Sequence, residues 1–312
     1  MERVKVGVVG VGYLGRIHAE KYACIPEAEL VGVVDIDKGR CQEVAAHINC
    51  QPFYHPLDLL GQVEAVSIAV PTLCHYQATK DFFLAGIDVL LEKPIASTVQ
   101  EARELNALAQ QKGAIFQIGH LERFNGALAA INGVLKSPLL IESYRLSPFS
   151  GRGTDVDVIL DLMIHDIDII LSIVGSEIEE VEAVGMPFFS SKIDVAHARI
   201  AFKDGCTAHI SASRIAQERL RKMVILQRDA HLAVDYLKQS LLVTRRGEGG
   251  TGGITVAEEV RENDPLEMEL RAFLQSVRER NTPVVSGEDG QRALEVALQI
   301  VDVINKSMKR WR

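Results

Sequence analysis

The chain contains few cysteines, and their pattern gives no sign of a disulfide framework. They are odd in number and widely scattered, and no two of them form a CxxC pair. This pattern is typical of reduced, mostly buried thiols in a cytoplasmic protein. The five are Cys24, Cys41, Cys50, Cys74 and Cys206.

Long apolar runs are also missing. No stretch reaches the roughly 18 uncharged apolar residues that a membrane-spanning helix needs. Residues 1–12 read as a strand interrupted by charges, without the apolar core and cleavage site of a signal peptide. There are no internal repeats, low-complexity tracts or long linkers. We therefore expect a cytoplasmic protein.

Positive charge is in deficit. The chain has 34 Lys and Arg against 42 Asp and Glu, for a net charge of −8. This balance argues against nucleic acid as the main partner, and it admits an anionic small molecule only where arginines or helix N-termini are focused locally. With 312 residues, 47% of them apolar, the chain is long enough for about two domains.

The N-terminus carries a glycine motif in an informative context. The β-branched run Val4–Val9 leads into GVGYLG at 10–15, and a helical pattern follows. A second strand, Leu30–Val34, ends in Asp35. In a dinucleotide fold the glycines admit the pyrophosphate and the acid holds the ribose hydroxyls; the alternative is a glycine turn with Asp35 as a strand-end cap. Since Asp35 and Asp37 would repel a 2′-phosphate, NAD is favoured over NADP.

Strands and helices continue to alternate up to residue 118. Near-continuous apolar strands separated by helices predict a parallel sheet covered on both faces, here a Rossmann domain over residues 1–120. We expect strands at Ala65–Val70, Asp88–Leu91 and Ala114–Ile118, with helices at Lys38–Ile48, His75–Ala85 and Thr98–Gln111.

Two strand ends of this sheet carry unusual residues. One reads Val70-Pro71-Thr72 with His75 close behind, and the other reads Glu92-Lys93-Pro94. Ligands of parallel sheets bind beyond the carboxyl ends of the strands. Pro94 restricts the backbone of Lys93 and thereby the direction of its amine. A strand-end lysine is ordinarily a solvated charge, but this position makes Lys93 a candidate for function.

A polar stripe runs along an otherwise apolar helical segment, DVDVILDLMIHDIDIILSIV at 155–174. Asp157, Asp161, His165 and Asp168 fall at i, i+4, i+8 and i+11, which places them on one helix face. Burying them without partners would cost several kcal/mol. The stripe therefore faces either a structural network or a wet cleft, and its spacing does not distinguish the two.

After residue 120 the pattern changes to strand after strand. We expect an α+β domain over 121–312 with a large, mostly antiparallel open sheet. It starts with a helix at Glu122–Lys136 and ends with helices at 265–280 and 287–308. Strands are expected at Leu139–Pro148, Glu177–Met186, Val195–Phe202, Thr207–Ser213, Lys222–Leu226, His231–Tyr236, Ser240–Thr244 and Ile254–Val260.

Together these motifs resemble the Gfo/Idh/MocA oxidoreductases over essentially the full length. The GxGxxG start, the acid ending strand two, the EKP tripeptide, the DxxxHxxD helix and VVSGEDGQRALEVALQI (284–300) carry the resemblance. GHLERFN (119–125) and GRGTDVDVILDLMIHDID (151–168) are similar to bacterial and archaeal UDP-N-acetylglucosamine 3-dehydrogenases. The resemblance implies oxidation of the 3-hydroxyl of a UDP-sugar, by hydride transfer to NAD.

The resemblance also implies the catalytic residues. Lys93 and His165 would act on the reacting hydroxyl, with Asp161 orienting the imidazole. We expect His165 to accept the proton and Lys93 to stabilise the developing alkoxide. The reverse, Lys93 as base, is equally reasonable chemistry. Asp157 and Asp168 would structure the stripe, since one base suffices.

Cofactor and substrate contacts follow from the same resemblance. NAD contacts would come from Gly10, Gly12, Tyr13, Leu14, Gly15, Asp35, Ile36, Pro71, Thr72, His75, Glu92 and Lys93. Arg123, Asn125 and Arg152 are candidates for the sugar nucleotide, because arginines bind diphosphate bidentately; each arginine could equally form a surface ion pair. No metal site is visible, since the nine histidines do not cluster.

Other readings stay open. The chain could oxidise a free sugar or an inositol-type polyol, act as an NAD-dependent glycosidase, or be a non-enzymatic regulator that senses NAD or sugars. By resemblance, helices 265–280 and 287–308 would pack back on the N-terminal domain. The open sheet would form a homo-oligomer, dimer or tetramer. An aminotransferase would use the keto product, in lipopolysaccharide or other cell-surface sugar biosynthesis.

Overall fold

The structure is a computed structural model that describes residues 3–151, 153–154, 156–246 and 252–309. It divides into two compact units. The first comprises Met1–Leu121 with Leu266–Gln291, and the second comprises Glu122–Pro265 with Arg292–Arg312. Within the described residues, no helix has both the length and the apolar composition needed to cross a membrane.

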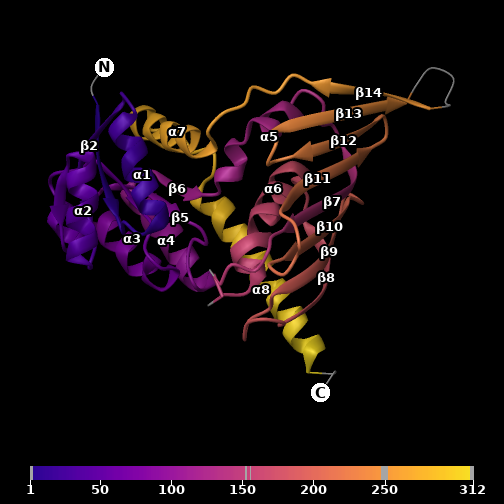
Figure 1. The fold of residues 1–312 in the computed structure, drawn as a ribbon, viewed down its shortest axis with the longest axis horizontal. Helices are drawn as coiled ribbons and strands as arrows, with labels where there is room; N and C mark the ends of the chain where they lie inside the picture. The colour runs from indigo at the N-terminus through magenta and orange to yellow at the C-terminus, as the bar shows by residue number, and fades with distance from the viewer. Residues whose placement is uncertain (1–2, 152, 155, 247–251, 310–312) are drawn as a thin grey trace. The chain divides into compact units, whose positions relative to one another are not determined.

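The first unit is built on a sheet of six parallel strands in the order β3-β2-β1-β4-β5-β6 (Figure 1). This is the strand order of the dinucleotide-binding Rossmann fold. Every residue of β4, β5 and β6 is buried. This agrees with the prediction, made from their apolar runs, of a sheet covered on both faces. The strands are β1 (Val4–Val9), β2 (Ala28–Val34), β3 (Gln51–Phe53), β4 (Ala65–Ile68), β5 (Asp88–Glu92) and β6 (Phe116–Gly119).

Five helices belong to this unit, and local signals explain their limits. Thr98 and Glu101 form a capping box at the start of α4, and Gly113 ends that helix in the left-handed conformation, with φ of 62°. Leu270 and Phe273 of α7 join the buried cluster that contains Val6 and Tyr22. The helices are α1 (Tyr13–Cys24), α2 (Lys38–Ile48), α3 (His75–Leu84), α4 (Val99–Lys112) and α7 (Pro265–Glu279).

The second unit contains an eight-stranded sheet in the order β14-β13-β12-β11-β7-β10-β9-β8. Neighbouring strands are antiparallel, except that β7 and β10 are parallel. Buried residues alternate with more exposed ones along β7, β9 and β12, as expected for a sheet with one open face. The strands are β7 (Pro138–Leu146), β8 (Ile178–Met186), β9 (Val195–Phe202), β10 (Thr207–Ser213), β11 (Leu220–Gln227), β12 (Ala230–Asp235), β13 (Ser240–Arg246) and β14 (Gly253–Glu258).

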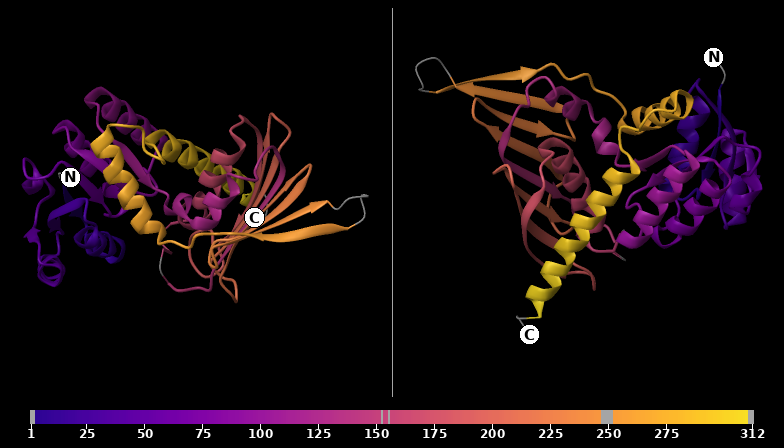
Figure 2. Two further views of the ribbon diagram at one scale, coloured as in Figure 1. Left: turned by 90° about the horizontal axis from the view of Figure 1, so that it is seen from above. Right: turned by 180° about the vertical axis from the view of Figure 1, so that it is seen from behind.

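The core of this unit lies between the sheet and three helices. Apolar residues of α5 (Gly126–Ile131), α6 (Ile164–Val174) and α8 (Gly287–Met308) join one buried cluster with the inward side chains of the strands. In Figures 1 and 2, α6 and α8 lie on one side of the sheet, and among the described elements no helix covers the other side. One sheet face is therefore left open.

Apart from shifts of a few residues at strand and helix ends and from short 3-10 turns, the elements differ from the predicted ones in three places. The short strand β3 was not predicted, because three residues at a sheet edge carry almost no pattern. The helix expected at Glu122–Lys136 is only six residues of α5, which begins after the N-cap Asn125. The helix expected over 155–174 begins with a π-helical turn at Ile159–Met163 and continues as α6.

The two C-terminal helices belong to different units. α7 falls in the first unit, and the start of α8 contacts β6, where Gly290 lies against Ile118. From Arg292 onward α8 is part of the second unit, and Ala297 and Ile300 are buried in its core. The resemblance predicts that both helices pack on the N-terminal domain, whereas most of α8 belongs to the second unit. The apolar stripe of α8 shows that one face is buried but does not show which core buries it.

Candidate active site

The glycine loop has the three local properties that a pyrophosphate site requires. Gly10 has φ of 84°, a conformation that side chains rarely adopt. A Cβ placed at Gly15 would lie 1.8 Å from the carbonyl oxygen of Gly10, so α1 can approach the loop only without a side chain there. At Gly12 a Cβ would meet nothing within 4 Å. Gly12 is also the N-cap of α1 and offers no side-chain cap, which leaves the helix N-terminus to bind an anion.

Asp35 follows β2 and is held by several donors. Its carboxylate accepts hydrogen bonds from the backbone amides of Val11 and Asp37, both at 2.9 Å. Arg40 also donates to it from Nε at 3.2 Å and from a terminal nitrogen at 2.9 Å. Burial alone would raise the pKa of Asp35, but these hydrogen bonds outweigh burial and hold the pKa below its ordinary value. Asp35 is therefore ionised and fixed beside the glycine loop.

Arg40 is a residue that the sequence analysis missed. Arg40 reaches back from the first turn of α2 to the carboxylate of Asp35. The sequence signal that could have indicated this ion pair is a basic residue five positions after Asp35, in the first turn of the next helix.

His75 joins two strand ends of the first sheet. Its Nδ1 lies 2.8 Å from the carbonyl oxygen of Pro94, and its Nε2 lies 2.9 Å from that of Val70. Burial lowers the pKa of His75, and the two carbonyls oppose this shift without cancelling it. A neutral ring donates to only one of the two carbonyls at a time. The ring is buried and links the loops after β4 and β5.

The EKP segment places Glu92 inside the unit and Lys93 nearer its surface. Glu92 is the last residue of β5 and is buried, whereas Lys93 is half-buried. One oxygen of Glu92 lies 3.1 Å from Nε2 of His18, and the other accepts a hydrogen bond from the backbone amide of Lys93 at 3.3 Å. His18 had not been singled out from the sequence, since a lone histidine on a helix face carries no signal of its own.

Several large apolar side chains stay exposed beyond the strand ends of the first sheet. Tyr13 follows β1, Ile36 follows β2, and Leu73 follows β4; they are 71%, 89% and 87% exposed. Leu14 is also exposed, and the neighbouring Pro71 and Thr72 lie at or near the surface. Exposed apolar groups at ligand-binding strand ends are suited to pack on the flat rings of a dinucleotide. The glycine loop, the fixed Asp35 and this apolar rim together fit NAD.

In the second unit, Asp161 and His165 lie at the start of the central helix. Asp161 belongs to the π-helical turn and His165 to the first turn of α6, and both are half-buried. Single π-helical turns within helices occur frequently at functional sites. A Cβ placed at Gly153 would lie 2.7 Å from a carboxylate oxygen of Asp161, so this loop packs closely on Asp161.

The loop beside Asp161 is anchored by Arg214, which was not predicted from the sequence. Arg214 donates hydrogen bonds to the carbonyl oxygens of Gly153 and Val156, the latter at 2.7 Å. Asp157 accepts a hydrogen bond from the amide of Ile193 at 2.8 Å. Asp157 thus has a structural partner at the start of the π turn. Arg152, a candidate for the sugar nucleotide, lies outside the described residues.

The other two candidate substrate residues have partners within the unit. Arg123 Nε lies 3.0 Å from a carboxylate oxygen of Asp168, which is buried. Asn125 caps α5 by accepting a hydrogen bond from Ala127, and its amide group donates to the carbonyl oxygen of Tyr236 at 3.1 Å. Of the four residues of the polar stripe, Asp168 is buried, and Asp157, Asp161 and His165 are half-buried. Asp157 and Asp168 have the protein partners just described.

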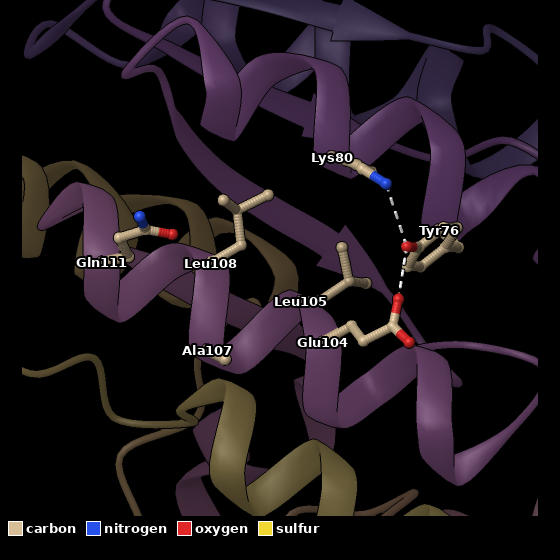
Figure 3. A pocket seen from close by; sticks show the side chains of 7 residues that line it. All are labelled: Tyr76, Lys80, Glu104, Leu105, Ala107, Leu108 and Gln111. Atoms are coloured by element: carbon tan, nitrogen blue, oxygen red, sulfur yellow. Dashed lines mark hydrogen bonds between the residues drawn. The ribbon is translucent and has the colours of Figure 1, made fainter.

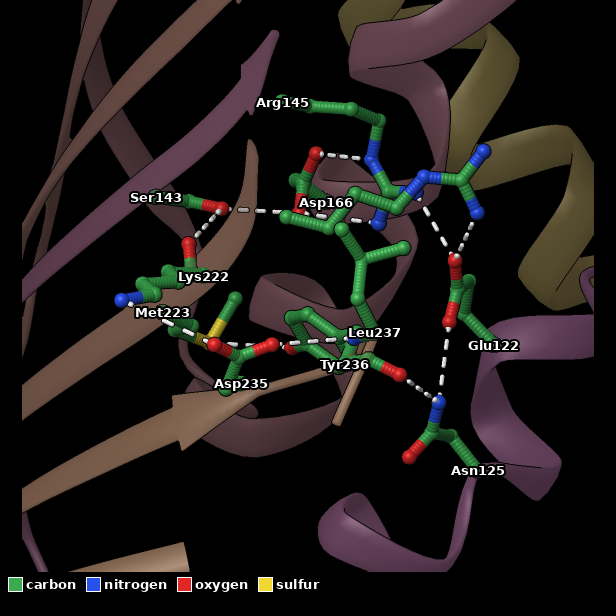
Figure 4. Close-up of polar contacts among 11 residues, drawn as sticks. Glu122, Asn125, Ser143, Arg145, Asp166, Lys222, Met223, Asp235, Tyr236 and Leu237 are labelled. Atoms are coloured by element: carbon green, nitrogen blue, oxygen red, sulfur yellow. Dashed lines mark hydrogen bonds and ion pairs between the residues drawn. The ribbon is translucent and has the colours of Figure 1, made fainter. Parts of the chain in front are cut away.

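A buried ionic network adjoins this pair (Figure 4). Arg145 donates to Asp166 at 2.7 Å and to Glu122 at 2.8 Å, and Ser143 donates to Asp166 at 2.7 Å. Burial disfavours the charged form of Arg145, but the two carboxylates outweigh burial and raise its pKa. Arg221 also donates to Glu122, at 3.1 Å. These groups tie β7, β11, α6 and the segment before α5 together.

A surface hollow of about 280 Å³ lies between α3 and α4 (Figure 3). Tyr76 crosses it, donating a hydrogen bond to Glu104 at 2.5 Å and accepting one from Lys80 at 3.2 Å. None of the site residues expected from the sequence lines it. The hollow is thus formed by outward helix faces, separate from the glycine loop.

Comparison with known proteins covers the whole chain. A model of an oxidoreductase family with an NAD-binding Rossmann fold matches residues 4–120, and a GFO/IDH/MocA C-terminal domain matches residues 126–232. UDP-N-acetylglucosamine 3-dehydrogenase of Acidithiobacillus ferrooxidans is 36% identical over 99% of this chain and 100% of its own. A solved structure of that enzyme has a TM-score of 0.93 and covers 97% of this chain and 98% of its own.

More distant relatives share the architecture. The scyllo-inositol 2-dehydrogenase of Bacillus subtilis is 25% identical over 98% of this chain and 95% of its own. A Lactobacillus casei scyllo-inositol dehydrogenase, solved with NAD(H) and scyllo-inositol, is 24% identical with a TM-score of 0.81 and covers 98% of both chains. At that identity the second match shows the fold alone.

These matches and the strand orders confirm the predicted fold class, the predicted family and the predicted cofactor. The chain belongs to the Gfo/Idh/MocA family and is an oxidoreductase with an NAD-binding Rossmann domain.

Proposed function

We propose that the protein oxidises the 3-hydroxyl of UDP-N-acetylglucosamine to the 3-keto derivative. The observation that carries this proposal is the end-to-end similarity to an enzyme of that name, 36% identical over 99% of this chain. The glycine loop and the fixed carboxylate of Asp35 support NAD as the oxidant. When bound, NAD accepts the hydride from the carbinol carbon.

The chain's own residues would handle the proton. His165 accepts the hydroxyl proton, and Asp161, four positions earlier, orients the imidazole and stabilises its charged form. Lys93 donates a hydrogen bond to the oxygen as negative charge develops. The reverse assignment, with Lys93 as base, remains the second candidate mechanism.

The protein partners of Arg123 and Asn125 change the roles that we propose for these two residues. Arg123 can hold the segment before α5 in place through its ion pair with Asp168. Asn125 can do the same as the N-cap of α5. We therefore propose both as residues that shape the substrate side of the site. We keep Arg152 as the candidate for the diphosphate, because a guanidinium can bind two phosphates bidentately.

The test supplies NAD with UDP-N-acetylglucosamine as the only sugar substrate and measures the formation of NADH through its near-ultraviolet absorbance. We expect turnover with this sugar nucleotide and none with free N-acetylglucosamine. The similarity to a scyllo-inositol 2-dehydrogenase makes inositols the second candidate class. Turnover of scyllo- or myo-inositol in place of the sugar nucleotide would contradict the proposal.

We also propose the cellular setting and the assembly. A 3-keto sugar nucleotide is a substrate for an aminotransferase, so the product would enter cell-surface sugar biosynthesis in the cytoplasm. The open face of the eight-stranded sheet would be covered by a second copy of the chain. Exposed apolar side chains along that sheet support this, among them Val184, Leu226 and Leu242, at 45%, 42% and 45% exposed.

A further inference from the structure

Three titratable side chains meet inside the nucleotide-binding unit. His18 comes from α1, Glu92 from the end of β5 and Glu269 from α7, and all three are buried. A ring nitrogen of His18 and one carboxylate oxygen from each glutamate all lie within 4.8 Å of one another. Residues more than 250 positions apart in the chain thus share one dry cluster. The proposed proton transfer uses neither of the two carboxylates.

Glu269 differs from Glu92 in its partners. Among the described residues neither oxygen of its carboxylate has a hydrogen-bond partner, and its exposed fraction is 0%. Glu92 has His18 on one oxygen and the amide of Lys93 on the other. Two carboxylates so close in a dry interior cannot both stay ionised. The negative charge belongs on Glu92, where donors surround it.

The titration directions agree with this division. Burial, and after it the charge of Glu92, raises the pKa of Glu269 well above its ordinary value. Burial would also raise the pKa of Glu92, but His18 and the Lys93 segment outweigh burial and lower it. Glu269 is therefore the neutral member of the pair.

We propose that Glu269 is a positioning residue that stays protonated and so keeps the single negative charge of the cluster on Glu92. Ionised Glu92 then holds the backbone amide of Lys93 and fixes the end of β5. Glu269 acts through Glu92 and makes no contact with substrate. This inference rests on the role proposed for the Lys93 segment at the cofactor.

The geometry around Glu92 leaves it little freedom. Gly119 pairs with Glu92 across β5 and β6, and a Cβ at Gly119 would lie 3.0 Å from the same oxygen that accepts from Lys93. Gln117 of β6 donates its amide hydrogen to the backbone carbonyl of Glu269 at 3.1 Å, which fixes α7 against the sheet. A displaced Glu92 carboxylate therefore moves the start of the EKP loop.

The remaining groups around Glu269 do not supply the charge that would ionise it. Tyr22 of α1 is neutral, because burial raises the pKa of its hydroxyl, which is hydrogen bonded to Ser67. His18 faces Glu92 directly at 3.1 Å. Lys93 directly follows β5. Its backbone amide donates to Glu92, and its positive charge helps to lower the pKa of Glu92.

The test compares NAD binding across pH in the wild type, in Glu269→Gln and in the control Glu279→Gln. The control carries the same substitution on the exposed side of α7. Raising the pH ionises Glu269 and places a second negative charge beside Glu92. We expect the NAD affinity of the wild type and of the control to fall by about tenfold at alkaline pH. A tenfold change in affinity has the same free energy as a shift of about one pKa unit. Glu269→Gln, which cannot ionise, should retain its affinity.

A second readout requires no activity. The infrared difference between wild type and Glu269→Gln at neutral pH should contain the carbonyl stretch of a protonated carboxylic acid. Absence of that band, or the same alkaline loss of NAD affinity in Glu269→Gln, would overturn the proposal. So would a stoichiometric metal ion that Glu269→Gln loses, since a metal would ionise both carboxylates. If Glu269→Gln does not fold, Glu269→Met replaces it.

Both readouts are independent of the sugar substrate. A chain that binds NAD with the expected pH profile but does not oxidise UDP-N-acetylglucosamine would contradict the proposed function alone. The reverse result would contradict the role of Glu269 alone.

Discussion

At the scale of single residues, the cofactor side of the site depends on an ion pair that forms within the chain. Arg40 and two backbone amides satisfy the carboxylate of Asp35 and keep it ionised. The carboxylate is therefore preorganised for ribose hydroxyls, and we expect the neighbouring Arg40 to attract a 2′-phosphate once the carboxylate is removed. Cofactor choice becomes a balance between these two side chains.

Replacing Asp35 with Ser should weaken NAD use and relax the preference over NADP. Hydrogen bonds to a charged group contribute about 1.5–3 kcal/mol, so kcat/KM for NAD should fall roughly tenfold to a hundredfold. With the carboxylate removed, Arg40 can attract the extra phosphate, and the NADP/NAD ratio should rise. The measurement is steady-state kinetics with both cofactors, with Asp58→Ser, an exposed change in the same unit, as the control. An unchanged ratio would show that Asp35 does not contact the ribose.

A second residue-scale prediction separates the two proposed proton-handling groups. His165→Asn should lower kcat by about a hundredfold to ten-thousandfold, the range typical of a lost general base, with little change in NAD affinity. Lys93→Met should lower kcat as well but keep the pH dependence that His165 imposes. The measurement is a pH–rate series on both variants. Near-normal turnover of His165→Asn would reverse the assignment and make Lys93 the base.

At the scale of elements, the second unit places its site helix with buried charge. β7 supplies Arg145, α6 supplies Asp166, and the segment before α5 supplies Glu122. Because taking charges out of water costs free energy that their attraction only partly returns, we expect this buried set to contribute more to the placement of the elements than to net stability. It fixes α6 on the sheet just after His165, whose ring must keep its direction for the proposed chemistry.

Removing the central cation of this network should be costly. Arg145→Met leaves two carboxylates buried without their partner, which should lower the free energy of unfolding by about 3–5 kcal/mol. The measurement is urea unfolding followed by circular dichroism. Lys203→Met, which breaks the exposed ion pair with Glu177 in the same unit, should leave the unfolding midpoint close to wild type. Equal effects of the two changes would mean that Asp166 and Glu122 are not left as uncompensated buried charges when Arg145 is removed.

At the scale of the whole molecule, one face of the eight-stranded sheet is left uncovered by the described helices of its own unit. Its strands alternate cleanly, so one face supplies the core and the other presents side chains to the surroundings. Apolar residues exposed on a broad sheet are typical of interfaces between subunits. This is the surface through which we propose that the protein self-associates.

A charge placed on that face should separate the subunits. Leu226→Glu introduces a carboxylate on β11 at a side chain that is 42% exposed. Leu84→Glu makes the same change at a 52% exposed leucine at the end of α3, in the other unit. Analytical ultracentrifugation should show smaller species for Leu226→Glu and wild-type behaviour for Leu84→Glu. A wild type that sediments as a monomer would contradict the proposed assembly.

The sequence by itself determined the features that are local in the chain. The limits of β1, α2, β9, β10 and α8 agree with the predicted ranges because capping residues and a consistent period specify them. The glycine loop was predicted from the spacing of its glycines. A side chain at Gly10 or Gly15 would meet backbone atoms, whereas the space at Gly12 is open. The parallel sheet and the antiparallel sheet followed from the same patterning.

Only the tertiary structure decided which polar groups share partners. The pairing of Arg40 with Asp35, the bond from Arg214 to the loop beside Asp161, and the meeting of Glu269 with Glu92 link residues that no spacing rule connects. The π-helical turn at Ile159–Met163 likewise departs from the regular period that predicted a single helix. Periodicity reports which face of an element is buried, whereas the charge state and direction of a buried polar group depend on what folding brings against it.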